Sequence, residues 1–390
     1  MKHLVGVLGS GLIGHDPFDP RCWSGSSRFF FGGLKARGCL RRAFGVEAPA
    51  WRRRWLMARN FRMRRDSWRM SFYLDTAYRD ELTRQVGLRL GPGDLDCDFL
   101  QLGALYDVPG LLRGRARCFS YHDGNLAESL RSPNAPRGLG ALTVDRALAY
   151  ERKVYLGMER VFAMSEYLRD SFIRDFDVPA DRVEAIGGGI NLESIPELAE
   201  DKRYDTDEIL FVGVDFRRKG GWTLLDAFAV ARKRRPGMTL HIVGPRHLLI
   251  PPGLESGVVF HGHLDKSDPV GLAKLEALFA RCSLFVLPSL YEPFGIAPLE
   301  AMAYALPCLV SDRWALREMV RPGESGDLVE PGDVDDLAGK IVAMTQDPDA
   351  LATMGLRGRR RVLDYYTWDR VVDRLLDALP GDVIEVGGAR

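Results

Sequence analysis

The sequence predicts an α/β protein with two doubly wound domains, each built on a parallel sheet. Two observations lead to this fold class. Short apolar runs alternate with helical segments of about ten residues, and a polar, charged segment at 198–208 divides the alternation into two blocks. Such alternation forms βαβ units, and 390 residues suffice for about two cores. We therefore expect one domain over 1–200, a second over 205–365, and a cleft between them.

The first block begins with a strand at 3–8, followed by a loop rich in Gly, Pro and Asp. The segment 26–85 is helical in character and dense in arginine. Further strands are expected at 99–102, 116–121, 161–165 and 182–191, the last running into a glycine-rich turn, and helices at 143–161 and 165–176.

The second block restarts the alternation after the polar segment. Strands are expected at 208–214, 238–244, 258–264, 284–289 and 307–312, and helices at 222–234, 272–282 and 298–305.

Composition indicates a soluble globular protein, with 46% hydrophobic and 27% charged residues and a formal charge of +1. No run approaches the roughly 18 apolar residues that span a bilayer, and the apolar start lacks a signal-peptide cleavage site. The cysteines are scattered without a C-x-x-C pair, at positions 22, 39, 97, 118, 282 and 308. We expect reduced, mostly buried thiols in a cytoplasmic protein.

The stretch GSGLIG, with glycines at 9, 11 and 14, has the spacing of a dinucleotide-binding turn. That turn needs a helix starting at its third glycine, but Pro17 and Pro20 follow here, and each disfavours helical geometry in the residue before it. No acid stands about 20 residues further on. A nicotinamide enzyme is therefore disfavoured, which leaves a plain strand-end loop or a loop lining the cleft.

The most informative stretch is LFVLPSLYEPFGIAPLEAMAYALPCLVSD, residues 284–312. Glu292 and Glu300 are separated by seven residues, and Pro298 fits the first turn of a helix, which we expect to contain Glu300. The backbone N–H groups of Phe294, Gly295 and Ile296 can point beyond the strand end. A helix N-terminus of this kind binds anions, so the pattern suits a nucleotide-sugar.

This segment resembles the E-x7-E signature of retaining glycosyltransferases of the GT-B fold, family 4. FVGVDFRRKGGWTLLDAF (211–228) is similar to the family's phosphate loop with its K-G pair, and 324–338 and 366–377 are similar to its closing segments. The resemblance is good from about 160 to 380. It implies two Rossmann-like domains, the donor on the second and the acceptor on the first, and a last helix in 366–390 that crosses back to the first.

The resemblance also implies roles for residues of the second domain. Lys219 and Arg218 would bind the diphosphate and stabilise the leaving group. Glu292 would contact the sugar, and Glu300 the ribose hydroxyls. Val214 stands where many relatives have arginine, so Arg217 or Arg218 would substitute. The remaining donor-side candidates are backbone or strand-end positions: Gly213, Gly244, Pro245, His261, Gly262, His263, Phe294, Gly295 and Ile296.

In the first domain, SYHDGN (120–125) resembles the acceptor-side loop. His122 is a catalytic candidate, and Asp123 and Asn125 are acceptor-side candidates, with an ordinary polar loop as the alternative. The loop from Gly11 to Gly25, which includes Ser24, occupies the place of the family's donor-facing glycine loop. GSGLIG would then be a phosphate-side loop with coincidental dinucleotide spacing.

No metal site and no permanently bound cofactor are expected; the co-substrate would be a nucleotide diphosphate-sugar, UDP- or GDP-linked. DLDCD (94–98) offers alternating acids, but an EF-hand loop starting at Asp94 would need Gly where Phe99 stands and Glu where Leu105 stands. A capped start of the next strand is the better interpretation.

Residues 35–69 contain twelve basic side chains against Glu47 and Asp66, a formal +10, with tryptophans at 51, 55 and 68. This segment could contact anionic lipid at the inner face of the cell membrane, an acidic acceptor, or only solvent. Treated as one helix its arginines surround the axis, and no nucleic-acid reader motif accompanies them.

Three functions remain open at this point. The first is a retaining, metal-independent glycosyltransferase that acts on a glycan, lipid-linked or small-molecule acceptor. The second is a nucleotide-sugar epimerase on the same fold, and the third is a non-catalytic sugar-nucleotide-binding protein. Glu292, Glu300 and Lys219 occur together, which favours an enzyme over the last of these.

Overall fold

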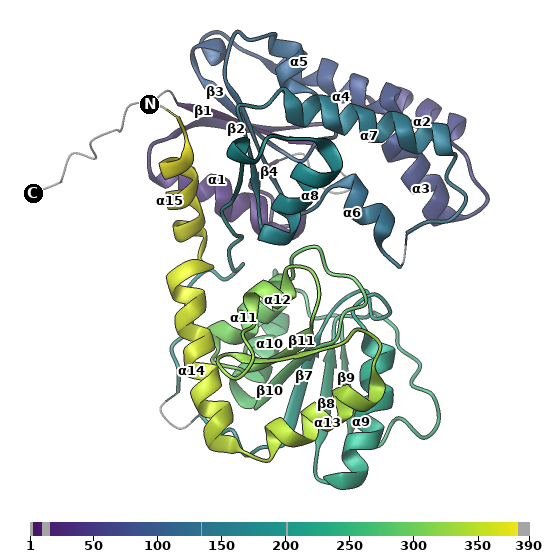
Figure 1. Ribbon diagram of the computed structural model, residues 1–390, viewed down its shortest axis with the longest axis vertical. Coiled ribbons are helices and arrows are strands. Elements are labelled where there is room, and N and C mark those ends of the chain that lie inside the picture. Colours follow the sequence, from purple (N-terminus) through teal and green to yellow (C-terminus); the bar gives the residue numbers. More distant parts are fainter. Residues whose placement is uncertain (1–2, 10–15, 134, 200–201, 381–390) are drawn as a thin grey trace, which may run out of the picture. The chain divides into compact units, whose positions relative to one another are not determined.

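The computed structural model describes residues 3–9, 16–133, 135–199 and 202–380 (Figure 1). The chain forms two compact units: one consists of Met1–Gly189 with Trp368–Arg390, and the other of Ile190–Thr367. It passes into the second unit ahead of the polar segment 198–208 and returns to the first at the last helix. The expected fold class of two α/β units is confirmed, and each unit has its own six-stranded sheet.

The sheet of the first unit has the order β2-β1-β3-β4-β5-β6, and all its neighbouring strands are parallel. Its strands are β1 (Leu4–Gly9), β2 (Leu40–Val46), β3 (Asp98–Leu102), β4 (Cys118–His122), β5 (Arg160–Ala163) and β6 (Val183–Ala185). Its helices are α1 (Ser26–Ala36), α2 (Ala50–Arg59), α3 (Arg65–Leu74), α4 (Thr76–Arg89), α5 (Val108–Leu112), α6 (Leu126–Arg131), α7 (Ala141–Leu156), α8 (Glu166–Phe176) and α15 (Trp368–Ala378).

The expectation of continuous helical character over 26–85 is wrong, because the edge strand β2 interrupts it. The arginines conceal this strand in the sequence. Arg42 extends its guanidinium to Asp94, 2.5 Å away, and stacks its cation over the Phe44 ring at 4.7 Å. The acids of DLDCD serve such pairs: Asp94 is buried against Arg42, and Asp98, the first residue of β3, pairs with Arg117 at 2.5 Å.

The sheet of the second unit has the order β12-β11-β10-β7-β8-β9, again parallel throughout. Its strands are β7 (Glu208–Val212), β8 (Thr239–Val243), β9 (Val258–Gly262), β10 (Leu284–Leu287), β11 (Cys308–Ser311) and β12 (Gly326–Val329). Its helices are α9 (Gly221–Arg234), α10 (Pro269–Arg281), α11 (Ile296–Ala303), α12 (Leu316–Met319), α13 (Val334–Thr345) and α14 (Pro348–Tyr365).

The order of this second sheet reverses between β7 and β10, because β8 and β9 extend it to one side and β11 and β12 to the other. In open parallel sheets, ligands bind outside the carboxyl ends of the strands at such a switch point. The sequence did not indicate β12, whose four residues include Asp327. It pairs closely with β11, since a Cβ on Gly326 would lie 1.9 Å from the Cys308 carbonyl oxygen.

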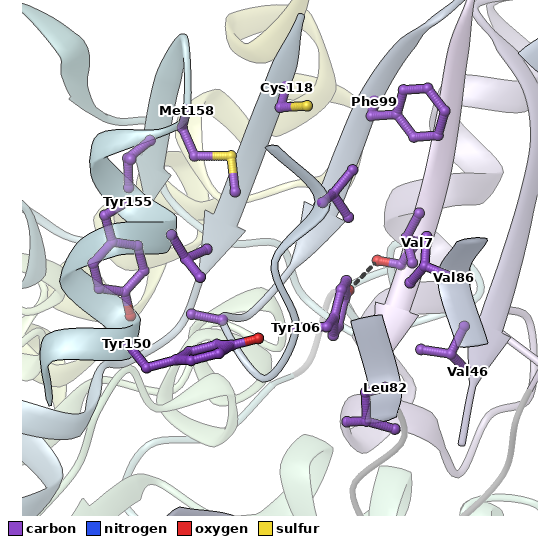
Figure 2. Packing of buried hydrophobic residues seen from close by; sticks show 14 of the residues in the cluster. Val7, Val46, Leu82, Val86, Phe99, Tyr106, Cys118, Tyr150, Tyr155 and Met158 are labelled. Carbon is purple, nitrogen blue, oxygen red and sulfur yellow. Dashed lines mark hydrogen bonds between the residues drawn. The ribbon is translucent and has the colours of Figure 1, made fainter. Parts of the chain in front are cut away.

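Figure 2 shows the core of the first unit, in which Tyr106 is hydrogen-bonded to Val7. The position of Tyr106 explains one glycine of GSGLIG. The Tyr106 hydroxyl donates to the carbonyl oxygens of Val7, at 2.7 Å, and Leu102, at 3.1 Å. Its ring lies so close to Gly9 that a Cβ there would be 2.4 Å from a ring carbon. Gly9 is therefore required by packing. No helix follows this stretch over residues 16–21, as expected, and Gly11 and Gly14 lie outside the described residues.

All six cysteines are free and buried, as the scattered spacing indicated. Among the helices that the structure describes, none has the length and apolar content needed to cross a bilayer.

The last helix, α15, packs on α1 within the first unit. Trp368 lies 5.9 Å from the Phe30 ring, between ring centroids, and Arg37 pairs with Asp369 at 3.0 Å and Asp373 at 2.7 Å. A Cβ on Gly189 would lie 2.5 Å from the Trp368 ring, so only glycine fits beside it.

Two glycine-to-alanine changes test this packing. Gly189→Ala should lower the free energy of unfolding by about 1–3 kcal/mol, because its methyl group overpacks Trp368. Gly32→Ala is the matched control: it lies within α1 with no atom within 4 Å of the added Cβ, and it should raise stability by about 0.5–1 kcal/mol. Urea denaturation measures both, and a Gly189→Ala variant as stable as Gly32→Ala would contradict the packing.

Candidate active site

The carboxyl ends of β7 and β10 bring the two charged motifs of the second unit together. Lys219 ends the loop that follows β7, and Glu292 lies in the loop that follows β10. The Lys219 ammonium donates to the Glu292 Oε2, and Ser289 donates to the same oxygen at 3.3 Å. Glu292 is buried, so its charge requires these partners. The ion pair thus stands at the switch point of the sheet.

Arg218 strengthens the link between the two loops. Its Nη1 donates to the Tyr291 carbonyl oxygen at 2.9 Å and lies 3.6 Å from the Glu292 carboxylate. The neighbouring Gly220 has a left-handed φ of 73°, and a Cβ there would lie 1.8 Å from the Pro288 carbonyl oxygen. The K-G pair therefore has two physical reasons: a cation for the site, and a residue without a side chain where two loops touch.

Arg217 takes no part in this cluster. It is exposed, as is Val214, and it makes no ion pair among the described residues. Of the two arginines expected to substitute at position 214, only Arg218 lies beside Glu292.

Glu300 lies on α11 and is buried against a lysine that the sequence did not single out. Lys266 Nζ is 2.5 Å from the Glu300 Oε1. Pro298 does fall in the first turn of α11, but Glu300 is the fifth helical residue, so the expectation that it lies in that first turn is wrong by one position. The carboxylate is therefore held near the helix start by α11 and neutralised by Lys266.

The start of α11 supplies backbone donors. Gly295 is its N-cap, with a left-handed φ of 100°, and a Cβ there would lie 2.8 Å from Leu316 and 3.1 Å from the Glu292 side chain. Phe294 is buried beneath it. The first N–H groups of a helix have no partner within the helix, so those of Ile296 and its neighbours can bind an anion.

The ends of β7, β8 and β9 meet through glycines. Gly213 donates to the Val243 carbonyl oxygen at 2.9 Å, and Gly244 donates to that of Gly262 at 2.8 Å. A Cβ on Gly244 would lie 2.5 Å from the Gly213 carbonyl group. His263 Nδ1 is 3.3 Å from the Gly244 carbonyl oxygen, and Pro245 is buried next to it. These positions share the edge of the sheet that carries Lys219.

His261 is the fourth of the five residues of β9, and its side chain contacts other protein groups. Its Nε2 lies 3.0 Å from His241 Nδ1, in a cluster with Glu208 and Arg281. Glu208 begins β7 and Arg281 ends α10, ahead of β10, whereas His241 and His261 lie within β8 and β9. The contact with His241 involves His261 Nε2, and the placement of His261 near the base stays a prediction.

This cluster includes three potential metal ligands. Atoms of Glu208, His241 and Cys282 lie within 4.8 Å of one another, the one such group found among the described residues. However, the Arg281 guanidinium lies 2.5 Å from Glu208 and 3.1 Å from His241, where a cation would bind. Burial raises the pKa of the Cys282 thiol to about 12 and, together with Arg281, lowers that of His241 to about 4. The arginine balances the carboxylate charge here.

In the first unit, the loop before α1 is strained. Trp23, Ser24 and Gly25 have left-handed φ values of 46°, 55° and 88°. The Trp23 indole donates to Asp123 at 2.9 Å and lies edge-on to Tyr121, with ring centroids 5.7 Å apart. Strain of this kind persists only where the surroundings fix it, and it is common at ligand sites. Trp23 thus joins the predicted donor-side loop to the predicted acceptor-side acid. The same loop's Gly11 lies outside the described residues.

His122 is the last residue of β4 and is fully buried. Its ring lies 5.2 Å from Tyr155 and 5.1 Å from Phe172, between centroids, and its Nε2 has no hydrogen-bond partner among the described residues. Burial lowers the pKa of this imidazole to about 3. His122 is therefore neutral across the physiological pH range.

Asn125 is committed to structure, which corrects its expected acceptor role. Its side-chain oxygen caps α6 by accepting from Glu128 N at 2.9 Å, and its amide donates to Ser171 at 2.9 Å. The cap pattern, Asn followed by an acid three residues later, was present in the sequence. Of the three acceptor-loop candidates, only Asp123 is exposed, whereas His122 and Asn125 are buried.

Comparison with known proteins gives the same fold. Residues 206–347 match the family described as Glycosyl transferases group 1. A sucrose-phosphate synthase from Thermosynechococcus elongatus superposes with a TM-score of 0.69 at 18% identity, covering 96% of this chain and 97% of that one. Anabaena HepE in complex with UDP-glucose gives 0.63 at 17%, covering 97% and 100%. The chain therefore has the GT-B fold.

Two relatives in sequence carry known activities. Glycogen synthase of Mycobacterium tuberculosis is 29% identical over 279 residues, which is 70% of this chain and 63% of that protein. The MMP alpha-(1->4)-mannosyltransferase of Mycolicibacterium hassiacum is 29% identical over 230 residues, 57% of this chain and 54% of that protein. The chain thus spans less than two-thirds of the length of these relatives.

The buried state of His122 can be tested by the pH dependence of stability. The unfolded imidazole binds a proton near pH 6.5 and the folded one only near pH 3, so the free energy of unfolding falls as pH drops below 6.5. The loss from this group is about 1.4 kcal/mol by pH 5.5. In His122→Asn this part of the pH dependence should disappear, whereas His247→Asn, at an exposed site, should keep it. Urea denaturation at pH 7.5 and 5.5 distinguishes the two outcomes, and an unchanged slope in His122→Asn would contradict the burial.

Proposed function

We propose that this protein is a retaining glycosyltransferase that transfers a sugar from a nucleoside diphosphate-sugar to an acceptor hydroxyl group. The observation that carries the proposal is the pair of buried carboxylates on the segment that follows β10, at the switch point of the second sheet. Glu292 is paired with Lys219, and Glu300 is paired with Lys266. Two further points support it: the match of residues 206–347 to Glycosyl transferases group 1, and the sugar-transferring relatives.

The diphosphate would bind between the Lys219 ammonium and the N–H groups at the start of α11. Arg218 lies near enough to Glu292 to share this charge. Glu292 would contact the donor sugar, and Glu300 would accept hydrogen bonds from the ribose hydroxyls. Lys266 is partly exposed and neutralises the Glu300 carboxylate before the ribose arrives.

In the transfer step, the bond between the anomeric carbon and the phosphate oxygen breaks, and its electron pair leaves with the diphosphate. The acceptor oxygen forms the new bond to that carbon on the same face, and its proton passes to the departing phosphate oxygen. Lys219 and Arg218 stabilise the negative charge that develops, as preorganised cations do. We propose that these side chains do so without a metal ion.

The first unit would bind the acceptor, with Asp123 as an exposed polar group, and Ser24 and Gly25 stay donor-side candidates. The neutral His122 imidazole would stand at the end of β4 as a hydrogen-bonding group. A glycan, a lipid-linked sugar or a small molecule would each supply the hydroxyl group. The six free thiols fit a reducing, cytoplasmic environment.

Calorimetry with UDP, GDP, ADP and TDP tests the donor site. One nucleotide should bind with EDTA present, and Lys219→Ala should weaken it about 10- to 100-fold, the value of a hydrogen bond to a charged group. Glu300→Gln should also weaken it, while Lys274→Ala, an exposed lysine on α10, should leave the affinity unchanged. Failure of all four nucleotides to bind, or equal binding by Lys219→Ala, would overturn the proposal.

Turnover with the matching nucleotide-sugars then separates the alternatives. Transfer to an acceptor, with the anomeric configuration of the donor conserved by NMR, is the expected result. A changed sugar formed from the donor alone would show an epimerase, and loss of activity in EDTA would contradict the metal-free proposal.

A further inference from the structure

The fold divides the basic segment 35–69 into two parts with different surroundings. Arg37, Arg41 and Arg42 are engaged within the first unit: Arg37 pairs with Asp369 and Asp373 on α15, and the other two pair with the buried Asp94. The remaining part, residues 50–69, forms α2, a short loop and the start of α3. It contains eight arginines and a single acid, Asp66, a formal +7.

The arginines of this second part are largely without carboxylate partners. Arg53 approaches Glu47 to 3.5 Å and Arg59 approaches Asp75 to 3.7 Å. The other six make no ion pair in the part of the chain that the structure describes: Arg52, Arg54, Arg62, Arg64, Arg65 and Arg69. A positive surface of this density attracts a polyanionic partner.

The same surface exposes four large apolar side chains. The exposed fractions are 69% for Trp51, 49% for Trp55, 56% for Phe61 and 91% for Met63. Trp51 and Trp55 are one turn apart on α2, while Leu56 on the other side of the helix is fully buried. The sequence-based view of one long helix with arginines all round was wrong, because two helices separate a core side from an apolar, basic outer side.

These side chains are held on a fixed scaffold. The Trp68 indole donates to the Met57 carbonyl oxygen at 2.8 Å, which ties α3 to α2, and Phe61 packs edge-on to Trp68 with centroids 5.5 Å apart. Asn60 bonds to both Leu56 and Asp75. Arg52 and Arg59 lie over the Trp55 ring at 5.0 and 5.6 Å. Helices α2 and α3 lie at the edge of the first unit (Figure 1).

We propose that this surface, formed by Trp51, Trp55, Phe61 and Met63 with the surrounding arginines, docks on an anionic lipid bilayer. Tryptophan is favoured at the boundary between headgroups and acyl chains, arginine binds lipid phosphates, and Phe61 and Met63 would enter the acyl region. A nucleic acid or an acidic glycan would satisfy the arginines but would give the exposed Met63 no apolar partner. The combination therefore fits lipid better than a soluble polyanion.

Co-sedimentation of the full chain with vesicles tests this proposal. Binding to phosphatidylcholine with 30% phosphatidylglycerol should be at least tenfold tighter than to phosphatidylcholine alone. The pair Trp51→Ser with Met63→Ser, and separately Arg54→Gln with Arg64→Gln, should each weaken it at least tenfold. Controls are Leu249→Ser and Arg360→Gln, which replace an exposed apolar side chain and an exposed arginine of the second unit and should have no effect.

Brominated acyl chains and a soluble polyanion provide the second readout. Tryptophan fluorescence should be quenched by brominated vesicles, less so in Trp51→Ser with Met63→Ser, and heparin should not bind as tightly as the vesicles. Equal binding to neutral vesicles, absence of binding, tighter binding to heparin, or no quenching would each overturn the proposal. UDP binding, measured on the same variants, should be unchanged, which keeps this test separate from that of the donor site.

Discussion

The ion pair between Lys219 and Glu292 is the interaction on which the account of this protein depends. It exists because the order of the strands in the second sheet reverses between β7 and β10, so two loops that are 73 residues apart in the chain meet at adjacent strand ends. The close contact of Gly220 with Pro288 brings these loops together, and burial of Glu292 makes a cationic partner necessary. Glu300, Lys266 and the start of α11 complete a charged, donor-rich edge around this pair.

Much of the fold followed from the sequence, because buried parallel strands are continuous apolar runs. EILFV and LFVL are of this kind, and they are β7 and β10. The strands that were missed lack such runs. In β2, arginines on the outer edge interrupt the apolar pattern, and β12 is only GDLV, recognisable by its pairing with β11 rather than by composition. Pairing between distant segments is not visible in a local window.

The candidate site was predictable in its charged motifs but not in its side-chain directions. Glu292 and Glu300 were singled out by their spacing around a helix start, and Lys219 by the resemblance to the glycosyltransferase family. Lys266 was missed because nothing in KSDP marks its contact with Glu300, which lies 34 residues further on. Ser289 and Trp23 were missed for the same reason. His261 and Asn125 were assigned to ligands, and the structure gives them protein partners on a neighbouring strand and at a helix start.

A crystal structure with UDP would show directly whether the nucleotide binds beside the Lys219–Glu292 ion pair. We expect the diphosphate at the carboxyl ends of β7 and β10, with its oxygens about 3 Å from Lys219 Nζ and from the first N–H groups of α11, and the ribose hydroxyls bonded to Glu300. Nucleotide bound away from Lys219, Glu300 and the start of α11 would contradict this expectation.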